Sequence, residues 1–216
     1  MQDARSIRDR AIREAKTNLI LDAARKVFAE KGFYEARLED IAAEAGFSKA
    51  SLYNYYDDKE AIFLNLAVRE YESLNARLNE AIEEDQTLER NLRLMLHLMF
   101  STFGDHFAII LAISAFRTTH LVNLEEIYAR HREYAGQFKE QFSRINELLV
   151  GLIARARKRG EVTVALGDGR CASFLGSLVR GVLFEWKIAG KIGNIEEAVD
   201  EILLFLRRGF GMVPVN

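Results

Sequence analysis

A run of polar and aromatic side chains between residues 49 and 54 has the residue types and spacing to do chemistry. Lysine pairs with phosphate, and serine, asparagine and tyrosine hydrogen-bond to phosphates or to base edges. A short helix that enters the major groove N-terminus first would present such side chains to DNA. The candidates for these contacts are Lys49, Ala50, Ser51, Tyr53 and Asn54.

Two short helices that cross at a glycine turn must position these side chains. Ile41, Ala45 and Leu52 are apolar at spacings that close a small core, so Leu52 should face inward. Gly46 supplies the turn, because a left-handed backbone is cheapest for glycine. Ser48 then restarts the chain as an N-cap. The pattern predicts a helix-turn-helix.

The N-terminal sequence resembles the TetR family of transcriptional regulators. The matching segments are Gly32-Phe33, Ile41-Ala42, Ala45-Gly46-Phe47-Ser48, Leu52-Tyr53-Asn54-Tyr55-Tyr56 and Lys59-Glu60. This motif is long and spaced, whereas the rest of the chain resembles the family only in its length and helical pattern. Three positions depart from the family pattern. Arg37 stands where a threonine or serine usually caps the first helix, Ala50 replaces a frequent glycine, and Tyr56 replaces phenylalanine.

The resemblance implies that double-stranded DNA is the partner of this head. The residues it assigns to DNA are Arg37, Ser48, Lys49, Ala50, Ser51, Tyr53, Asn54, Tyr55 and Lys59. In the family, the lysine that matches Lys59 contacts a phosphate, and a cation in the first turn of a helix gains nothing from the helix dipole. Tyr53 and Tyr55 lie two residues apart, so both cannot face the interior of one helix. Tyr56 is expected in the core.

The head is not basic overall. Residues 1–60 contain 11 Lys or Arg and 12 Asp or Glu, so phosphate binding depends on where the cations lie. A localised basic patch suffices to neutralise phosphates. Five cations precede the first apolar stripe, namely Arg5, Arg8, Arg10, Arg13 and Lys16. They are either such a patch or a solvated helix end.

Apolar periodicity predicts helices along the whole chain, and Pro214 is the single proline, so no internal proline breaks them. The first amphipathic helix should end at Gly32. Asp57 and Glu60 form a predicted capping box for a long helix over 58–84. Further helices are expected over 87–103, 105–116, 124–159, 168–189 and 195–210. The predicted fold is all-α, with a three-helix helix-turn-helix DNA-binding head over 1–57 on a helical-bundle ligand-binding and dimerisation domain over 58–216.

The last two predicted helices have the composition of a subunit interface. One helix carries an apolar stripe beside a face of small residues, and the other is apolar nearly all round, which a monomer surface would tolerate poorly. In the resembling family, these helices form a four-helix dimer interface, which places two heads on successive major grooves of a palindromic site. The predicted homodimer contacts are Leu175, Val179, Val182, Leu183, Trp186, Ile202 and Leu206.

The middle of the chain is rich in large apolar side chains with polar groups among them. Members of the family bind a small effector there, which shifts the heads between DNA-competent and incompetent states. The predicted pocket residues are Phe100, Phe103, Phe107, Phe116, Arg117, His120, Tyr128, Tyr134 and Phe138, with His97, His106 and His131 as further polar groups. An apolar or amphipathic effector with an anionic end near Arg117 is expected. A fatty acyl compound and an aromatic xenobiotic fit equally well.

Two other function classes stay open on the sequence. One is a helical scaffold or adaptor whose helix-turn-helix contacts protein, and the other is a metal-dependent enzyme. The sequence has no GxSxG, Walker or GxGxxG motif, and its histidines lack the i, i+3 or i, i+4 spacing of helical metal ligands. Neither a cofactor nor a metal is therefore expected. Cys171 is the single cysteine and no long apolar run is present, so a cytoplasmic protein with no membrane partner is predicted.

Overall fold

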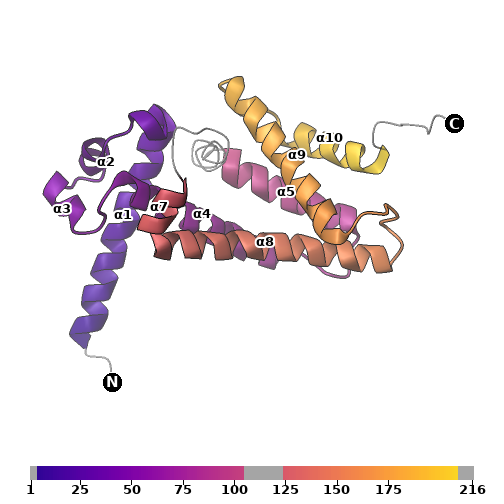
Figure 1. Cartoon of the computed structure of the whole chain (residues 1–216), viewed down its shortest axis with the longest axis horizontal. Helices are drawn as coiled ribbons and strands as arrows, with labels where there is room; N and C mark the ends of the chain where they lie inside the picture. Colours follow the sequence, from indigo (N-terminus) through magenta and orange to yellow (C-terminus); the bar gives the residue numbers. More distant parts are fainter. Residues whose placement is uncertain (1–3, 105–123, 209–216) are drawn as a thin grey trace. The chain divides into compact units, whose positions relative to one another are not determined.

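The computed structural model describes residues 4–104 and 124–208, which form helices and connecting loops with no strand in these two ranges (Figure 1). The fold is therefore all-α, as predicted. None of the described helices is long and apolar enough to cross a membrane. The helices are α1 (Ala4–Glu35), α2 (Leu38–Glu44), α3 (Lys49–Tyr53), α4 (Lys59–Ala81), α5 (Leu88–Gly104), α7 (Leu124–Arg130), α8 (Arg132–Lys158), α9 (Asp168–Ile188) and α10 (Ile195–Arg208).

The chain forms two compact units. The first contains the described residues 4–70 and 124–139, and the second contains 71–104 and 140–208. Helices α4 and α8 each contribute one part to each unit. The predicted domain boundary after residue 57 falls inside the first unit, because the beginning of α4 packs with the N-terminal helices.

The core of the first unit is built on the apolar face of α1. Ile20 and Phe28 have no exposed surface, and Phe28 contacts Phe63 of α4 edge to face at 5.9 Å between ring centroids. The Phe33 ring also packs on the Phe63 ring, with 4.8 Å between the ring centroids. Gly32 has φ 76° and ψ 162°, so the regular part of α1 ends there, as predicted. This aromatic cluster fixes the first residues of α4 against the end of α1.

Helices α2 and α3 form the predicted helix-turn-helix. Gly46 has φ 72° in the turn, and Ser48 Oγ accepts a hydrogen bond from the Ser51 backbone N–H at 3.1 Å as the N-cap of α3. Ile41 is fully buried and Leu52 is 1% exposed, so both point into the head. Helix α2 begins after Arg37, whose backbone N–H donates to the Asp40 carboxylate at 3.0 Å.

The structure corrects three features of the predicted helices. The N-cap of α4 is Asp58, whose Oδ1 accepts from the Ala61 N–H at 2.8 Å, so the predicted capping box of Asp57 and Glu60 is wrong. The predicted helix over 124–159 is interrupted at His131, which separates α7 from α8. Helix α4 ends at Ala81, three residues before its predicted end. The predicted helix over 105–116 lies outside the described residues.

The core of the second unit takes up most of the predicted subunit interface, because α9 and α10 both pack on α5. Leu175, Val179, Leu183 and Ile202 are each at most 5% exposed within the single chain. Trp186 packs on Phe100 of α5, with 5.2 Å between ring centroids. Leu175, Val179, Leu183 and Ile202 therefore have little surface to offer a second subunit and do not fit their assignment to the interface, whereas Trp186 is half-buried. Of the other two predicted contacts, Val182 is half-buried and Leu206 is 45% exposed.

Candidate nucleic-acid interface

The outer face of α3 presents most of the side chains that the sequence assigns to DNA. Lys49, Ala50 and Asn54 are exposed, Tyr53 is 47% exposed, and Ser51 is half-buried. Since Leu52 on the opposite side of α3 is buried in the head, packing holds the helix that carries these side chains in place. The arrangement can place a lysine, a phenol and an amide against the edges and backbone of a duplex groove.

Ser48 and Ser51 are engaged with each other. In addition to the capping bond, their hydroxyl oxygens lie 2.8 Å apart, within hydrogen-bond distance. Ser48 is exposed, so its oxygen can still accept from an outside donor, but its first role is to begin α3. Both serines therefore shape the reading helix as well as its surface.

Lys49 forms an ion pair with Glu39 of α2. This hydrogen bond raises the pKa of the Lys49 ammonium and holds the pKa of the Glu39 carboxyl below its usual range. The ammonium also lies 5.9 Å from the centroid of the Tyr53 ring. For Lys49 to contact a phosphate, it must exchange the Glu39 carboxylate for that phosphate.

Other carboxylates of the head pair with cations of α1 and α4. Lys26 binds Glu44 at 2.9 Å, and Lys31 binds Asp40 at 2.8 Å. The hydrogen bond from Lys31 lowers the pKa of Asp40. Arg69 of α4 binds Asp22 at 2.9 Å. These pairs neutralise acidic groups within the head, which the residue count alone does not reveal.

The tyrosines after Leu52 divide between surface and core, as predicted. Tyr55 is half-buried, and the Arg13 guanidinium lies over its ring at 5.3 Å from the centroid. Tyr56 is 3% exposed and accepts a hydrogen bond from the Asn65 amide at 2.7 Å. Burial raises the pKa of Tyr56, which keeps its phenol neutral. Tyr53 and Tyr55 remain candidates for DNA contact, and Tyr56 is core.

The structure gives Lys59 a different role from the predicted phosphate contact. Its Nζ donates to the carbonyl oxygens of Phe33, Tyr34 and Ala36 at 2.9, 3.0 and 3.1 Å. It also lies 4.8 Å from the centroid of the Phe33 ring. The flexible stem carries the charge from the N-terminus of α4 to the C-terminal end of α1, where the helix dipole is negative. All three ammonium protons are used there, so a contact of Lys59 with phosphate would have to displace at least one of these carbonyl oxygens.

Arg37 is exposed at the start of α2, and only its backbone joins the hydrogen bond to Asp40. The guanidinium is thus on the surface of the head. Its contact with the DNA backbone stays a prediction.

His131 is a residue whose position sequence reasoning did not foresee. It is buried, and its Nε2 lies 3.0 Å from the carboxylate of Asp58, the N-cap of α4. Arg130 approaches the same carboxylate at 3.6 Å. The break between α7 and α8 is therefore attached to the start of α4 within the first unit. No sequence signal marks this pair, since the two residues are 73 positions apart.

The predicted effector residues that the structure describes are divided between the two units. Phe100 is fully buried in the second unit, whereas Phe138 is buried and Tyr128 and Tyr134 are half-buried in the first. Tyr134 packs on Tyr56 at 6.3 Å between ring centroids. Five other predicted residues and the side chain of Phe103 lie outside the part of the chain that the structure describes; the five are Phe107, Phe116, Arg117, His106 and His120. Among the further histidines, His97 lies 3.2 Å from Glu196 on the surface of the second unit.

Known proteins are similar to this chain in the segment that forms the head. The family model described as bacterial regulatory proteins, tetR family, matches residues 20–66, the segment that runs from α1 into α4. The HTH-type transcriptional regulator UidR of Escherichia coli (strain K12) is 26% identical over 164 residues, covering 76% of this chain and 78% of that protein. The fatty acid metabolism regulator protein of Bacillus subtilis (strain 168) is 32% identical over 103 residues, covering 47% of this chain and 53% of that protein.

Solved structures show the same fold over most of the chain. FadR from Bacillus subtilis in complex with stearoyl-CoA superposes with a TM-score of 0.72 at 20% identity, covering 89% of this chain and 98% of that one. FadR from Bacillus halodurans gives a TM-score of 0.71 at 18% identity over the same shares. The likeness therefore extends beyond the helix-turn-helix to the helices that follow it.

Proposed function

This chain belongs to the TetR family of bacterial transcriptional regulators, and on that premise we propose that it is a homodimeric repressor that a small effector releases from a palindromic operator. The observation that carries the proposal is the exposed face of α3, held rigidly by the Ser48 cap and by buried Leu52. Lys49, Tyr53 and Asn54 on this face are the groups assigned to phosphates and base edges.

The proposed partner in the dimer is a second copy of the chain, bound through α9 and α10. On α9, the residues that point away from the core repeat at helical spacing, with two large aromatic groups flanking small residues. Phe174, Phe184 and Ile188 are 49%, 53% and 73% exposed, with Ser177 and Gly181 between them. On α10, Leu204 and Leu206 are 50% and 45% exposed.

This proposed interface differs from the one predicted from the sequence, of which it keeps Leu206. The small residues let a partner helix approach closely, and the aromatic groups supply apolar area. Exposed apolar groups that repeat along one side of a helix, as they do on α9, mark an association surface. A two-fold dimer formed there carries two identical heads, so its operator should have two inverted half-sites.

The proposed effector is a fatty acyl thioester. Of the two ligand classes that the sequence leaves open, this one is supported by relatives, since one similar protein is a fatty acid metabolism regulator and one similar structure contains stearoyl-CoA. Repression fits a mechanism in which the effector stabilises a conformation that binds DNA poorly.

Selection of bound genomic fragments by the purified protein tests the DNA-binding function. The best fragment is then titrated by fluorescence anisotropy at several salt concentrations, with and without acyl-CoA of 8 to 18 carbons. We expect an inverted repeat, bound by two chains with a steep salt dependence, and weaker binding in the presence of one range of chain lengths.

Each result decides a separate part of the proposal. An enriched site without inverted symmetry would refute the two-fold dimer on DNA. Binding that is unchanged by every acyl-CoA would refute the effector class. Absence of salt-dependent binding to any duplex would refute DNA recognition and favour the protein-binding adaptor.

A further inference from the structure

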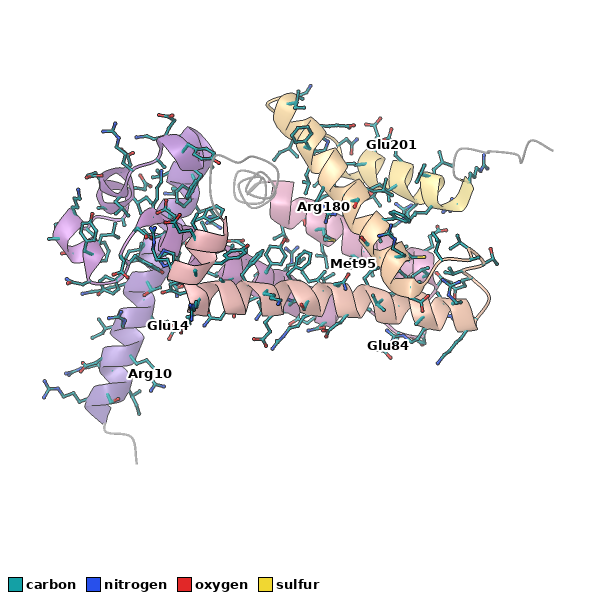
Figure 2. The ribbon with its side chains drawn as sticks, viewed as in Figure 1. Arg10, Glu14, Glu84, Met95, Arg180 and Glu201 are labelled. Atoms are coloured by element: carbon teal, nitrogen blue, oxygen red, sulfur yellow. The ribbon has the colours of Figure 1, made fainter. Side chains whose placement is uncertain are left out.

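The N-terminal half of α1 is a long exposed helical segment that the helix-turn-helix does not account for. Residues 5–16 are all exposed, although they are helical and continuous with the buried part of α1 (Figure 2). Ala11 and Ala15 and the arginines are strong helix formers, which explains why the helix continues beyond its packed part. We call residues 4–17 the N-terminal arm.

The cations of the arm follow a helical stripe. In a helix with 3.6 residues per turn, residues separated by 3, 4, 7, 8 or 11 positions lie on the same side. Arg5, Arg13 and Lys16 are related by such spacings, and the same series continues to Ile20 and Val27, which are buried against the head. The basic side of the arm is therefore the continuation of the buried side of α1, the helix that packs on α2.

A direct contact confirms this orientation. The Arg13 guanidinium lies over the ring of Tyr55, which follows α3. Arg10 lies at the edge of the same stripe, and neither Arg10 nor Lys16 has an ion pair among the residues that the structure describes. Asp9 lies in the stripe and approaches Arg5 and Arg8 only at 3.9 Å.

The arm has a net positive charge and extends well beyond its contact with the head. It contains five cations and two carboxylates, Asp9 and Glu14. From Arg13 to Arg5 the helix rises about 12 Å, at about 1.5 Å per residue. Arg10 and Lys16 can reach phosphates without breaking an ion pair of the residues that the structure describes. This differs from Lys49, which is paired with Glu39.

We propose that the N-terminal arm is a second DNA-contacting element, which binds phosphates beside the groove that α3 reads. Guanidinium groups in a row suit the phosphates of a nucleic-acid backbone, and such contacts add affinity without sequence preference. This inference rests on the proposed DNA-binding function and adds a defined surface to it.

An anionic membrane is the other partner that a basic helix could suit. Ile7 is 55% exposed on the side opposite the basic stripe, whereas Ile12 is 47% exposed on the same side as Arg5 and Lys16. The Arg13 contact with Tyr55 favours DNA, because it turns the basic side toward the helix-turn-helix. The test below separates the two partners.

The test compares two triple variants that remove the same charge. The arm variant is Arg5→Gln, Arg10→Gln and Lys16→Gln, which leaves Arg13 on Tyr55. The control variant is Lys158→Gln, Lys191→Gln and Arg208→Gln, at exposed positions of the second unit. Both are titrated with the selected operator and with a mixed-sequence 30-base-pair duplex at several salt concentrations, and hydroxyl-radical footprinting maps the protected sugars. Both are also mixed with vesicles of phosphatidylglycerol.

For the arm variant, we expect the slope of log K against log salt to fall by about 2–3 per chain, at about 0.9 per phosphate contact. Both duplexes should lose affinity equally, and some sugar protection should disappear. A slope equal to that of the control variant would overturn the inference while leaving the proposed function intact. Arm-dependent vesicle binding with an unchanged DNA slope would overturn it in favour of a membrane. A wild-type chain that binds no duplex would refute the proposed function itself.

Discussion

Replacement of Lys59 by methionine separates a structural role from a DNA contact at this position. Methionine keeps an unbranched stem of similar length but removes the ammonium and its three hydrogen bonds to the carbonyl oxygens of Phe33, Tyr34 and Ala36. A hydrogen bond to a charged group contributes about 1.5–3 kcal/mol. Here one half-buried ammonium donates all three hydrogen bonds, and in the variant the three carbonyl oxygens can accept hydrogen bonds from water instead.

We therefore expect Lys59→Met to lower the free energy of unfolding by about 2 kcal/mol in total, rather than by three separate increments. For a chain of this length, 1 kcal/mol corresponds to about 2–4 °C, so the Tm should fall by about 4–8 °C. Urea unfolding followed by circular dichroism at one fixed protein concentration measures the change. The control is Lys139→Met, which removes the same charge from an exposed position of the first unit and should change stability by less than about 0.5 kcal/mol.

The salt dependence of DNA binding supplies the refuting result. If the ammonium is used at the end of α1, the slope of log K against log salt for Lys59→Met should match that of the Lys139→Met control, at temperatures where both are folded. A phosphate contact would instead lower the slope by about 0.9 per chain. Unchanged stability together with that lower slope would show that the carbonyl contacts are dispensable and that the reasoning is wrong.

Three further changes test the head and the proposed interface. Glu39→Gln releases the Lys49 ammonium, so we expect several-fold tighter binding to every duplex at low salt; equal affinity in anisotropy titrations would contradict competition between this carboxylate and phosphate. Asp58→Ala removes the cap of α4 and leaves a buried imidazole without its partner, which should cost about 2–3 kcal/mol in urea unfolding. Asp57→Ala, at the neighbouring exposed position, should cost less than about 0.5 kcal/mol. Phe184→Asp places a charge in the exposed stripe of α9, and sedimentation velocity should show a monomer; a variant that still sediments as a dimer refutes the interface.

The helix-turn-helix was predictable because its determinants are local. Gly46 is required for the left-handed turn, Ser48 caps the next helix within three residues, and Leu52 closes the core a few positions away. Each interaction spans a short stretch of sequence, so residue type and spacing are sufficient to specify it. The family model matches residues 20–66, which contain this segment.

The predicted subunit interface included four core residues for a reason that lies in helix packing. Hydrophobic periodicity shows that α9 has two faces to bury, but it does not state which face meets α5 of the same chain. Leu183 and Phe184 are adjacent, yet they are 2% and 53% exposed. A rotation of one residue about the helix axis, about 100°, decides between core and surface.

By itself, the sequence determined the helical class, the turn and cap of the reading head, and the side chains on the outer face of α3. Only the tertiary structure decided where the long cations act. A long lysine or arginine side chain can carry its charge several ångströms from its own helix. Lys59 therefore reaches the end of α1, Lys49 reaches Glu39, and Arg13 reaches the ring of Tyr55. These partners belong to other elements of the head, at least ten positions away in sequence, and folding alone brings them together.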